Sequence, residues 1–200
     1  MAAPAGGVRA HAGGGGDEVA AQWTSEFPDR VVYVLDLRLP PRDRIPILEA
    51  AAAAARQIGD RRGEGNRLGN LGSAYYTLGE VRRAIEYCEQ ALSVAREIGD
   101  RGGEGNDLGN LGKAYADLGE VRRAIEYYGQ ALTVTREIGD RRGEADHCWN
   151  LGLLYEDSDP ARAAELMQVR VEYEREIGHP DAEADAERVQ GLLNKLGKGK

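Results

Sequence analysis

The chain contains two adjacent forty-residue segments that are near-copies of each other. Arg61–Asp100 and Arg101–Asp140 align without a gap, and 31 of their 40 positions are identical. A fixed repeat of this length is typical of a solenoid, in which each unit buries its apolar face only against its neighbours. The repeat therefore limits the fold to a linear stack of similar units, an architecture that commonly serves as a binding surface.

Each near-copy carries the signals of two helices joined by a short turn. In the first copy, Asp60 is placed to cap a helix, and an apolar stripe at helical spacing runs from Leu68 to Tyr75. Gly79 then ends that helix, because glycine readily takes the left-handed conformation that other residues resist. A second apolar stripe follows from Val81 to Val94. This pattern predicts an all-α fold built from helical hairpins.

Residues 141–178 are predicted to form a third, less regular unit. They keep Leu151-Gly152 and Tyr155, whereas their turn has become Asp159-Pro160, which suits an N-cap followed by the first residue of a helix. Arg170 falls at the position where the first unit has Ala91. A charge at such a tight position predicts looser packing around this second helix.

The chain before the near-copies is predicted to hold one more, degenerate unit. Val31–Leu35 has strand propensity, but the forty-residue register places it in a first helix. Pro40-Pro41 would make the turn, and residues 45–58 the second helix. The expected division is a disordered Ala/Gly-rich tail at 1–27, a degenerate helical repeat at 28–60, repeats at 61–100, 101–140 and 141–178, and a capping helix at 181–197.

The composition argues against several functional classes. The formal net charge of −8 disfavours a general binder of nucleic acid or anionic membranes, which needs clustered Lys and Arg. No apolar run approaches the roughly 20 residues of a membrane span, and residues 1–10 lack the apolar core of a secretory signal. Cys88 and Cys148 give no disulfide framework. We expect a cytoplasmic, monomeric protein without a nucleic-acid or membrane partner.

No residues of the sequence are arranged for catalysis. His147 neighbours Cys148, but adjacent helical residues point in different directions. No His/Cys/Asp spacing matches a zinc site, and Gly109–Lys113 lacks the spacing of a phosphate-binding loop. We therefore expect no enzyme activity, no catalytic residue, no metal and no cofactor.

The residues that recur in each unit resemble the tetratricopeptide signature. HEAT and armadillo units have similar lengths, but Leu71-Gly72-x-x-Tyr75, Gly79, Ala84 and Ala91 follow the tetratricopeptide pattern. The extended forty-residue form resembles the Pins-type and kinesin-light-chain class of these repeats. The resemblance implies a right-handed α-solenoid whose first helices line a concave groove for a protein or peptide partner.

The segment before the repeats resembles a junction in another family. Gln22-Trp23 and Tyr33–Leu39 are similar to the residues that precede repeats in bacterial NB-ARC/STAND signalling ATPases, where such arrays act as sensors. The sequence has no Gly-x4-Gly-Lys-Ser/Thr motif. Because the segment resembles the junction but the sequence lacks the ATPase motif, the alternative function is the sensor part of a STAND-type signalling system, separate from its ATPase. An array with a purely structural role is a third possibility.

The family resemblance maps the groove onto positions 66, 70, 73, 76 and 77 and their counterparts forty residues on. Positions 73, 76 and 77 differ between the near-copies, while the buried Leu, Gly and Tyr positions do not. Such differences fit either binding or drift of a solvated face. The predicted partner-binding residues are Asn66, Asn70, Ser73, Tyr76, Thr77, Asn106, Asn110, Lys113, Asp117, Trp149, Asn150, Leu153 and Glu156.

Two of these predictions carry a specific chemical role. Asn70, Asn110 and Asn150 recur at one position, and a ladder of amides can hold the main chain of an extended peptide. Each could instead bond the backbone of the neighbouring unit and specify packing. Trp149 is either an aromatic anchor for the partner or a side chain partly buried between helices.

Overall fold

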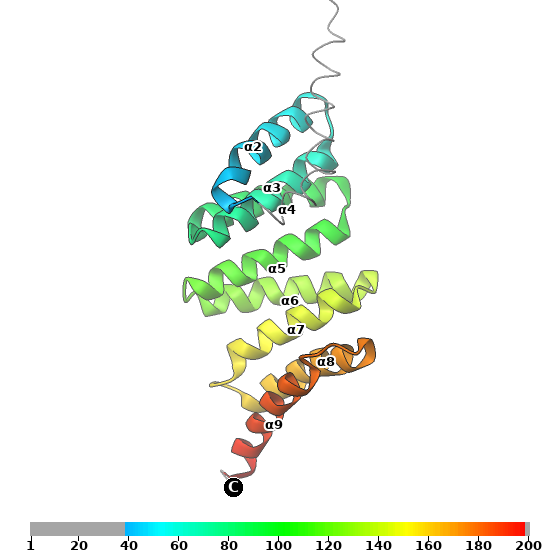
Figure 1. Cartoon of the computed structure of the whole chain (residues 1–200). Coiled ribbons are helices and arrows are strands. Elements are labelled where there is room, and N and C mark those ends of the chain that lie inside the picture. The colour runs from blue at the N-terminus through cyan, green and yellow to red at the C-terminus, as the bar shows by residue number, and fades with distance from the viewer. Residues whose placement is uncertain (1–38, 199–200) are drawn as a thin grey trace, which may run out of the picture.

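The computed structural model describes residues 39–198, which form a stack of helices joined by short turns. The helices follow one another in chain order from α2 at one end to α9 at the other (Figure 1). They are α2 (Pro41–Gln57), α3 (Arg61–Thr77), α4 (Val81–Ile98), α5 (Arg101–Asp117), α6 (Val121–Ile138), α7 (Arg141–Tyr155), α8 (Pro160–Ile177) and α9 (Ala182–Lys198). The predicted all-α solenoid is confirmed for this part of the chain.

Some predictions fall outside the described residues. These are the tail at 1–27, the first helix of the degenerate unit, and all but the last residue of the segment that resembles the ATPase junction. The second helix of that unit is present as α2, but it begins at Pro41 rather than at residue 45. Pro41 is tolerated there because the first residue of a helix needs no N–H partner within it.

The predicted helix ends are confirmed. The side chain of Asp60 accepts a hydrogen bond from the backbone N–H of Gly63 at 2.8 Å, and Asp159 does the same for Arg162 at 3.1 Å. Gly79 has φ +78°, and the N–H of the next residue donates to the carbonyl of Tyr75. These caps satisfy backbone groups that the helix itself leaves unpaired, so each hairpin starts and stops where the sequence indicates.

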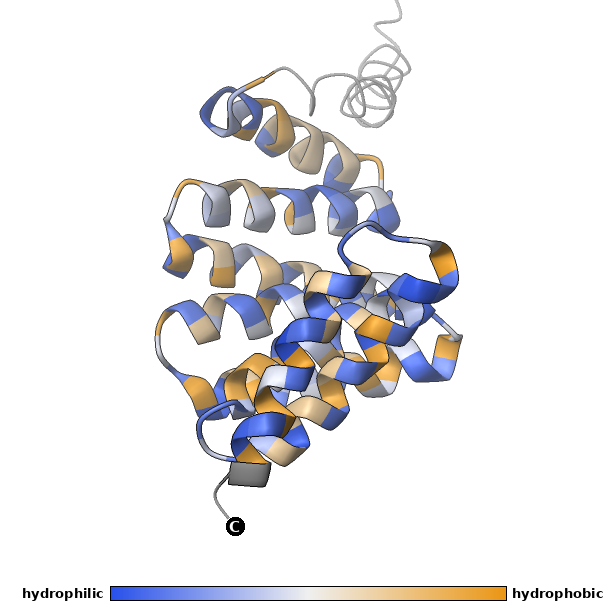
Figure 2. Cartoon of the chain, turned by 60° about the horizontal axis from the view of Figure 1, so that its bottom comes forward, coloured by the Kyte–Doolittle hydropathy of each residue, from blue (hydrophilic) through white to orange (hydrophobic). Residues whose placement is uncertain are grey.

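The core of the stack crosses the boundaries between units. One cluster of buried residues joins α4, α5 and α6, and within it Leu108 and Leu111 are completely shielded from solvent. Hydrophobic and hydrophilic positions alternate along the helices (Figure 2). No helix in the described range is long and apolar enough to cross a lipid bilayer. Each unit thus buries apolar surface against its neighbours as well as within its own hairpin.

Within each unit the two helices meet at a glycine. A Cβ atom built on this glycine would lie within 3 Å of a side chain on the second helix. The facing pairs are Gly72 with Cys88, Gly112 with Tyr128, and Gly152 with Met167. The glycine is therefore required for the close approach of the two helices, whereas the facing residue changes from unit to unit.

Buried glutamates join consecutive units. Glu64, only 1% exposed, accepts hydrogen bonds from Arg56 of the preceding helix, at 2.6 Å, and from Arg61. The same arrangement recurs forty residues later at Glu104. Because removing one partner of a buried ion pair leaves an uncompensated charge, these contacts fix how one unit sits on the next.

Arg170 corrects the expectation of looser packing around α8. Its Nε lies 2.8 Å from Glu174 and 3.0 Å from Asp185 of α9, and its Nη1 lies 3.2 Å from Asp146 of α7. Its guanidinium group also lies over the ring of Trp149, 5.2 Å from the centroid. Arg170 therefore ties three helices together in place of the small apolar contact of the earlier units.

The first helices of the three units lie on the inner side of a bend. α3 packs against α5, and α5 against α7, in addition to their hairpin partners. Among the described residues, α4, α6 and α8 make no contact of comparable extent with one another. Closer approach on one side curves the stack, so α3, α5 and α7 line its concave face.

Two glycine variants test this account of the helix packing. Gly112→Ala should lower the free energy of unfolding by about 1–3 kcal/mol, since the new Cβ would lie 2.9 Å from Cγ of the Tyr128 ring. Gly129→Ala on α6 meets nothing within 4 Å and should raise it by up to roughly 1 kcal/mol through helix propensity. Urea denaturation of both variants measures the difference, and equal effects would contradict the packing role of Gly112.

Candidate partner-binding groove

A groove of about 570 Å³ runs along the concave face. Its lining comes chiefly from α3, α5 and α7, with α4 and α6 contributing to the floor. Seven of the predicted partner-binding residues line it, namely Asn66, Asn70, Ser73, Asn106, Asn110, Lys113 and Asn150. The structure thus brings residues from three successive units onto one surface.

Tyr76 and Thr77 line a smaller adjoining cavity of about 140 Å³ instead. Tyr76 donates a hydrogen bond from its hydroxyl to Asp117 of the next unit. The ammonium group of Lys113 lies over the Tyr76 ring, 4.5 Å from the centroid. Burial and the bond to Asp117 raise the pKa of Tyr76 to about 12, so the hydroxyl stays protonated and remains a donor.

The remaining predicted residues lie away from both cavities. Trp149 is half-buried and packs against the α8–α9 cluster beneath Arg170, between helices rather than in the groove. Glu156 forms an ion pair with Arg188 of α9 at 2.8 Å. Leu153 lines neither cavity. In the third unit, the groove therefore receives Asn150 but not these three side chains.

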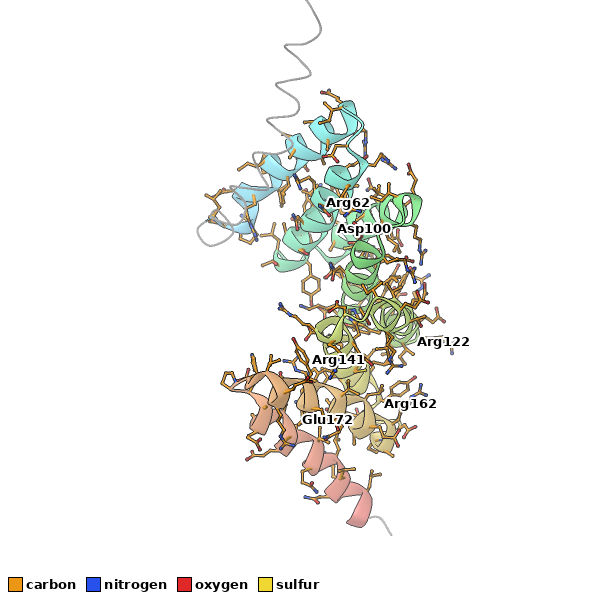
Figure 3. The ribbon with its side chains drawn as sticks, turned by 90° about the vertical axis from the view of Figure 1, so that its right-hand side faces the viewer. Arg62, Asp100, Arg122, Arg141, Arg162 and Glu172 are labelled. Carbon is orange, nitrogen blue, oxygen red and sulfur yellow. The ribbon has the colours of Figure 1, made fainter. Side chains whose placement is uncertain are left out.

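Charged residues mark the two sides of the stack. Arg62 and Asp100 lie close together in Figure 3, with their side chains 3.9 Å apart, and both line the groove. Arg122 and Arg162, from the second helices, project from the opposite edge. Arg122 is exposed, as expected for a solvated outer face.

The asparagine ladder is open toward the groove. Asn70 and Asn110 make no hydrogen bond with any residue of the described range. The amide nitrogen of Asn150 donates to the carbonyl of Asp146, 2.8 Å away in its own helix. None of the three bonds the backbone of a neighbouring unit within that range, so the amide groups of Asn70 and Asn110 are available to a ligand.

Two buried titratable residues also line the groove, although they were not among the predicted partner-binding residues. Asp107 is 7% exposed and His147 is 8% exposed. Oδ1 of Asp107 lies 3.0 Å from a Cβ built on Gly69, and Cε1 of His147 lies 2.4 Å from one built on Gly109. Each side chain thus occupies space left by a glycine of the preceding first helix. In the sequence, the sign that these side chains could be buried was the recurrence of glycine at Gly69 and Gly109, forty residues apart.

The surroundings of these two groups change their protonation. Burial, assisted by the charge of Asp100, raises the pKa of Asp107 to about 7. Burial lowers the pKa of His147, against the opposing effect of Asp146 and Asp140, and its Nε2 has no hydrogen-bond partner among the described residues. The groove lining therefore holds a carboxyl group with a pKa near neutral, in one unit, and a buried imidazole with a lowered pKa, in the next.

The described residues contain no group of three or more His, Cys, Asp or Glu side chains that could hold a metal ion. Both cysteines are buried, and burial raises the pKa of Cys88 to about 12 and that of Cys148 to about 11. A thiol that stays protonated is a poor nucleophile. The chemistry that the groove offers is hydrogen bonding by amides and contact with apolar and aromatic walls.

The raised pKa of Asp107 predicts a pH-dependent stability. The folded protein binds this proton more tightly than the unfolded chain, whose pKa is near 3.8, so stability should fall as pH rises from about 4 to 7. Asp107→Asn cannot ionise. Its free energy of unfolding relative to wild type should therefore rise by roughly 2–3 kcal/mol between pH 5 and pH 8. Urea denaturation at both values measures this, and a pH-independent difference would contradict the assignment.

Comparison with known proteins agrees with this architecture. The sequence matches the tetratricopeptide-repeat family over residues 67–137. No curated protein sequence matches the chain significantly.

Several solved structures share the fold at low sequence identity. A signal-transduction ATPase of the STAND class with a tetratricopeptide repeat sensor, from Pyrococcus horikoshii, is 22% identical with a TM-score of 0.75; the match covers 88% of this chain and 27% of that one. Aspartyl phosphate phosphatase F from Bacillus subtilis is 14% identical with a TM-score of 0.71, covering 92% of this chain and 51% of that one. The chain thus spans between about a quarter and a half of these two proteins.

A third similar structure has nearly the same length as this chain. It is a putative kinesin light chain from Podosopora anserina with nearly identical tetratricopeptide-like repeats, 17% identical with a TM-score of 0.61, and the match covers 90% of this chain and 95% of that one. At these identities the likeness concerns the fold. Together with the family match over residues 67–137 and the helical hairpins, it shows that the chain contains tetratricopeptide repeats and has an α-solenoid fold.

Proposed function

We propose that the protein is an interaction scaffold or adaptor that binds an extended peptide segment of a partner protein in the groove along α3, α5 and α7. The observation that carries this proposal is the pair of open amides at Asn70 and Asn110, one unit apart on the concave face. An amide both donates and accepts, so each can bond one peptide group of an extended chain. Regularly spaced amides match the regular repeat of such a backbone.

The other side chains of the groove support a peptide rather than a nucleic acid. Lys113 and Arg62 are the basic residues of the lining, and three acidic residues, Asp100, Asp107 and Asp146, accompany them. A phosphate backbone requires an excess of positive charge. A peptide, with alternating donors and acceptors and little net charge, suits this mixed surface better.

A second candidate is the sensor part of a STAND-type signalling ATPase system. The observation in its favour is the likeness in fold to the STAND protein whose tetratricopeptide repeats are described as a sensor. In this reading a partner bound in the same groove would regulate an ATPase domain. Copurification of the protein with such an ATPase, and a change in ATP hydrolysis when a groove-binding peptide is added, would favour the sensor over the adaptor.

The groove is tested by selecting peptides from a random library on the wild-type protein and measuring their Kd by fluorescence anisotropy. The double variant Asn110→Arg with Lys113→Glu should weaken binding by at least about 100-fold, because it removes one amide and reverses the neighbouring charge. Its circular dichroism should remain that of the wild type.

A matched control is Arg122→Gln, which changes the net charge by the same single unit on the outer face. This variant should bind the selected peptides with the wild-type Kd. Unchanged affinity in the double variant, or an equal loss in the control, would contradict binding in the concave groove.

A further inference from the structure

A cavity of about 140 Å³ lies beside the groove in the first repeat. Ser73, Asn110 and Lys113 line both the cavity and the groove, so the two adjoin each other. The inner wall is made by Gly72, Ala84 and Cys88, and the outer wall by Tyr76 and Thr77. In size it is close to an engineered cavity of about 150 Å³ that accepts benzene.

The repeat itself explains why this space is open in the first unit. Position 88 holds cysteine, and the equivalent positions in the other units hold much larger side chains. These are Leu48 in α2, Tyr128 in α6 and Met167 in α8, all buried. The first complete unit therefore has the smallest side chain of the series at this point.

The second unit shows what fits in such a space. The ring of Tyr128 lies flat on Gly112, with Cγ, Cδ1 and Cδ2 all within 3.0 Å of a Cβ built on that glycine. The first unit has the same glycine and alanine, Gly72 and Ala84, where the second has Gly112 and Ala124. Its side-chain atom nearest to a Cβ built on Gly72 is the sulfur of Cys88, which takes the place of the tyrosine ring. The protein thus places an aromatic ring in one unit and leaves the corresponding volume unfilled in the other.

Tyr76 of the outer wall, and the residues that contact it, differ between the near-copies. Tyr76 replaces the alanine of the second unit, and it contacts Lys113 and Asp117, which replace serine and threonine of the first. These differences therefore meet in space across the boundary between two units. They hold Tyr76 in place as an aromatic wall and leave the space between it and Cys88 open.

We infer that the cavity between Tyr76 and Cys88 receives an aromatic side chain from a peptide bound in the groove. The ring enters past Asn110 and packs between Tyr76 and Gly72, as Tyr128 packs on Gly112. Ser73, Asn110 and Lys113 at the entrance can bond a phenol hydroxyl, so tyrosine suits the cavity as well as phenylalanine. This inference rests on the proposed peptide-binding function, and it names the side chain that the groove selects.

The cavity is tested directly with p-cresol, the side chain of tyrosine, by NMR titration of the full chain. Wild type should show saturable shifts at the amides of Gly72, Ala84 and Cys88. Cys88→Tyr and Cys88→Met fill the space with residues that other units already hold there, and both should abolish these shifts. Cys88→Ser, which keeps the volume, and Ser93→Tyr, which adds a ring on the exposed face of α4, should retain them.

Peptides selected from the random library give the second readout. They should share an aromatic residue, and its replacement by alanine should weaken binding to wild type by about tenfold or more. The same replacement should change binding to Cys88→Met by less than about twofold, because the filled cavity no longer distinguishes the two peptides.

The two readouts separate the inference from the function on which it rests. Failure of p-cresol to bind wild type, shifts elsewhere in the chain, or full binding to both filled variants would overturn the cavity assignment. Selected peptides without a shared aromatic residue would overturn it as well. If p-cresol binds at the cavity but no peptide is selected, the proposed peptide-binding function fails while the cavity stands.

Discussion

The contact on which the structure depends is the one between a glycine of each first helix and a side chain of the second. At Gly72, Gly112 and Gly152 the absence of a Cβ lets the facing side chain approach to a distance that any other residue would prevent. Glycine lowers the intrinsic stability of these helices, so burial between units must offset that cost. The same contact holds each hairpin closed and thereby sets which faces of α3, α5 and α7 remain for the groove.

The glycine is the same in the two near-copies, whereas the residue that faces it, Cys88 or Tyr128, and the inner-surface positions 73, 76 and 77 differ. A tyrosine or methionine fills the space in one unit, and a cysteine leaves it open in another. Around that opening, Tyr76 and Lys113 contact each other across the boundary of two units. Two nearly identical copies can in this way present different surfaces without a change in their packing.

The fold could be predicted from the sequence because its determinants are local. Caps such as Asp60 and chain-reversing glycines such as Gly79 act within one hairpin, and the forty-residue period fixes how hairpins follow one another. The inner position of the asparagines followed from the family resemblance. The surroundings of Asp107 could not be predicted, because its burial depends on Gly69 of the preceding unit.

The third unit was harder to predict for the same reason. Trp149 and Glu156 were expected in the groove, but Trp149 packs with Arg170 and Glu156 pairs with Arg188. Arg170 and Glu156 both pair with residues of α9, whose sequence differs from that of the first helices in the near-copies. The most direct test of the central claim is hydrogen–deuterium exchange of the protein with and without a selected peptide. Groove binding predicts added protection in α3, α5 and α7, whereas protection confined to α4, α6 and α8 would contradict it.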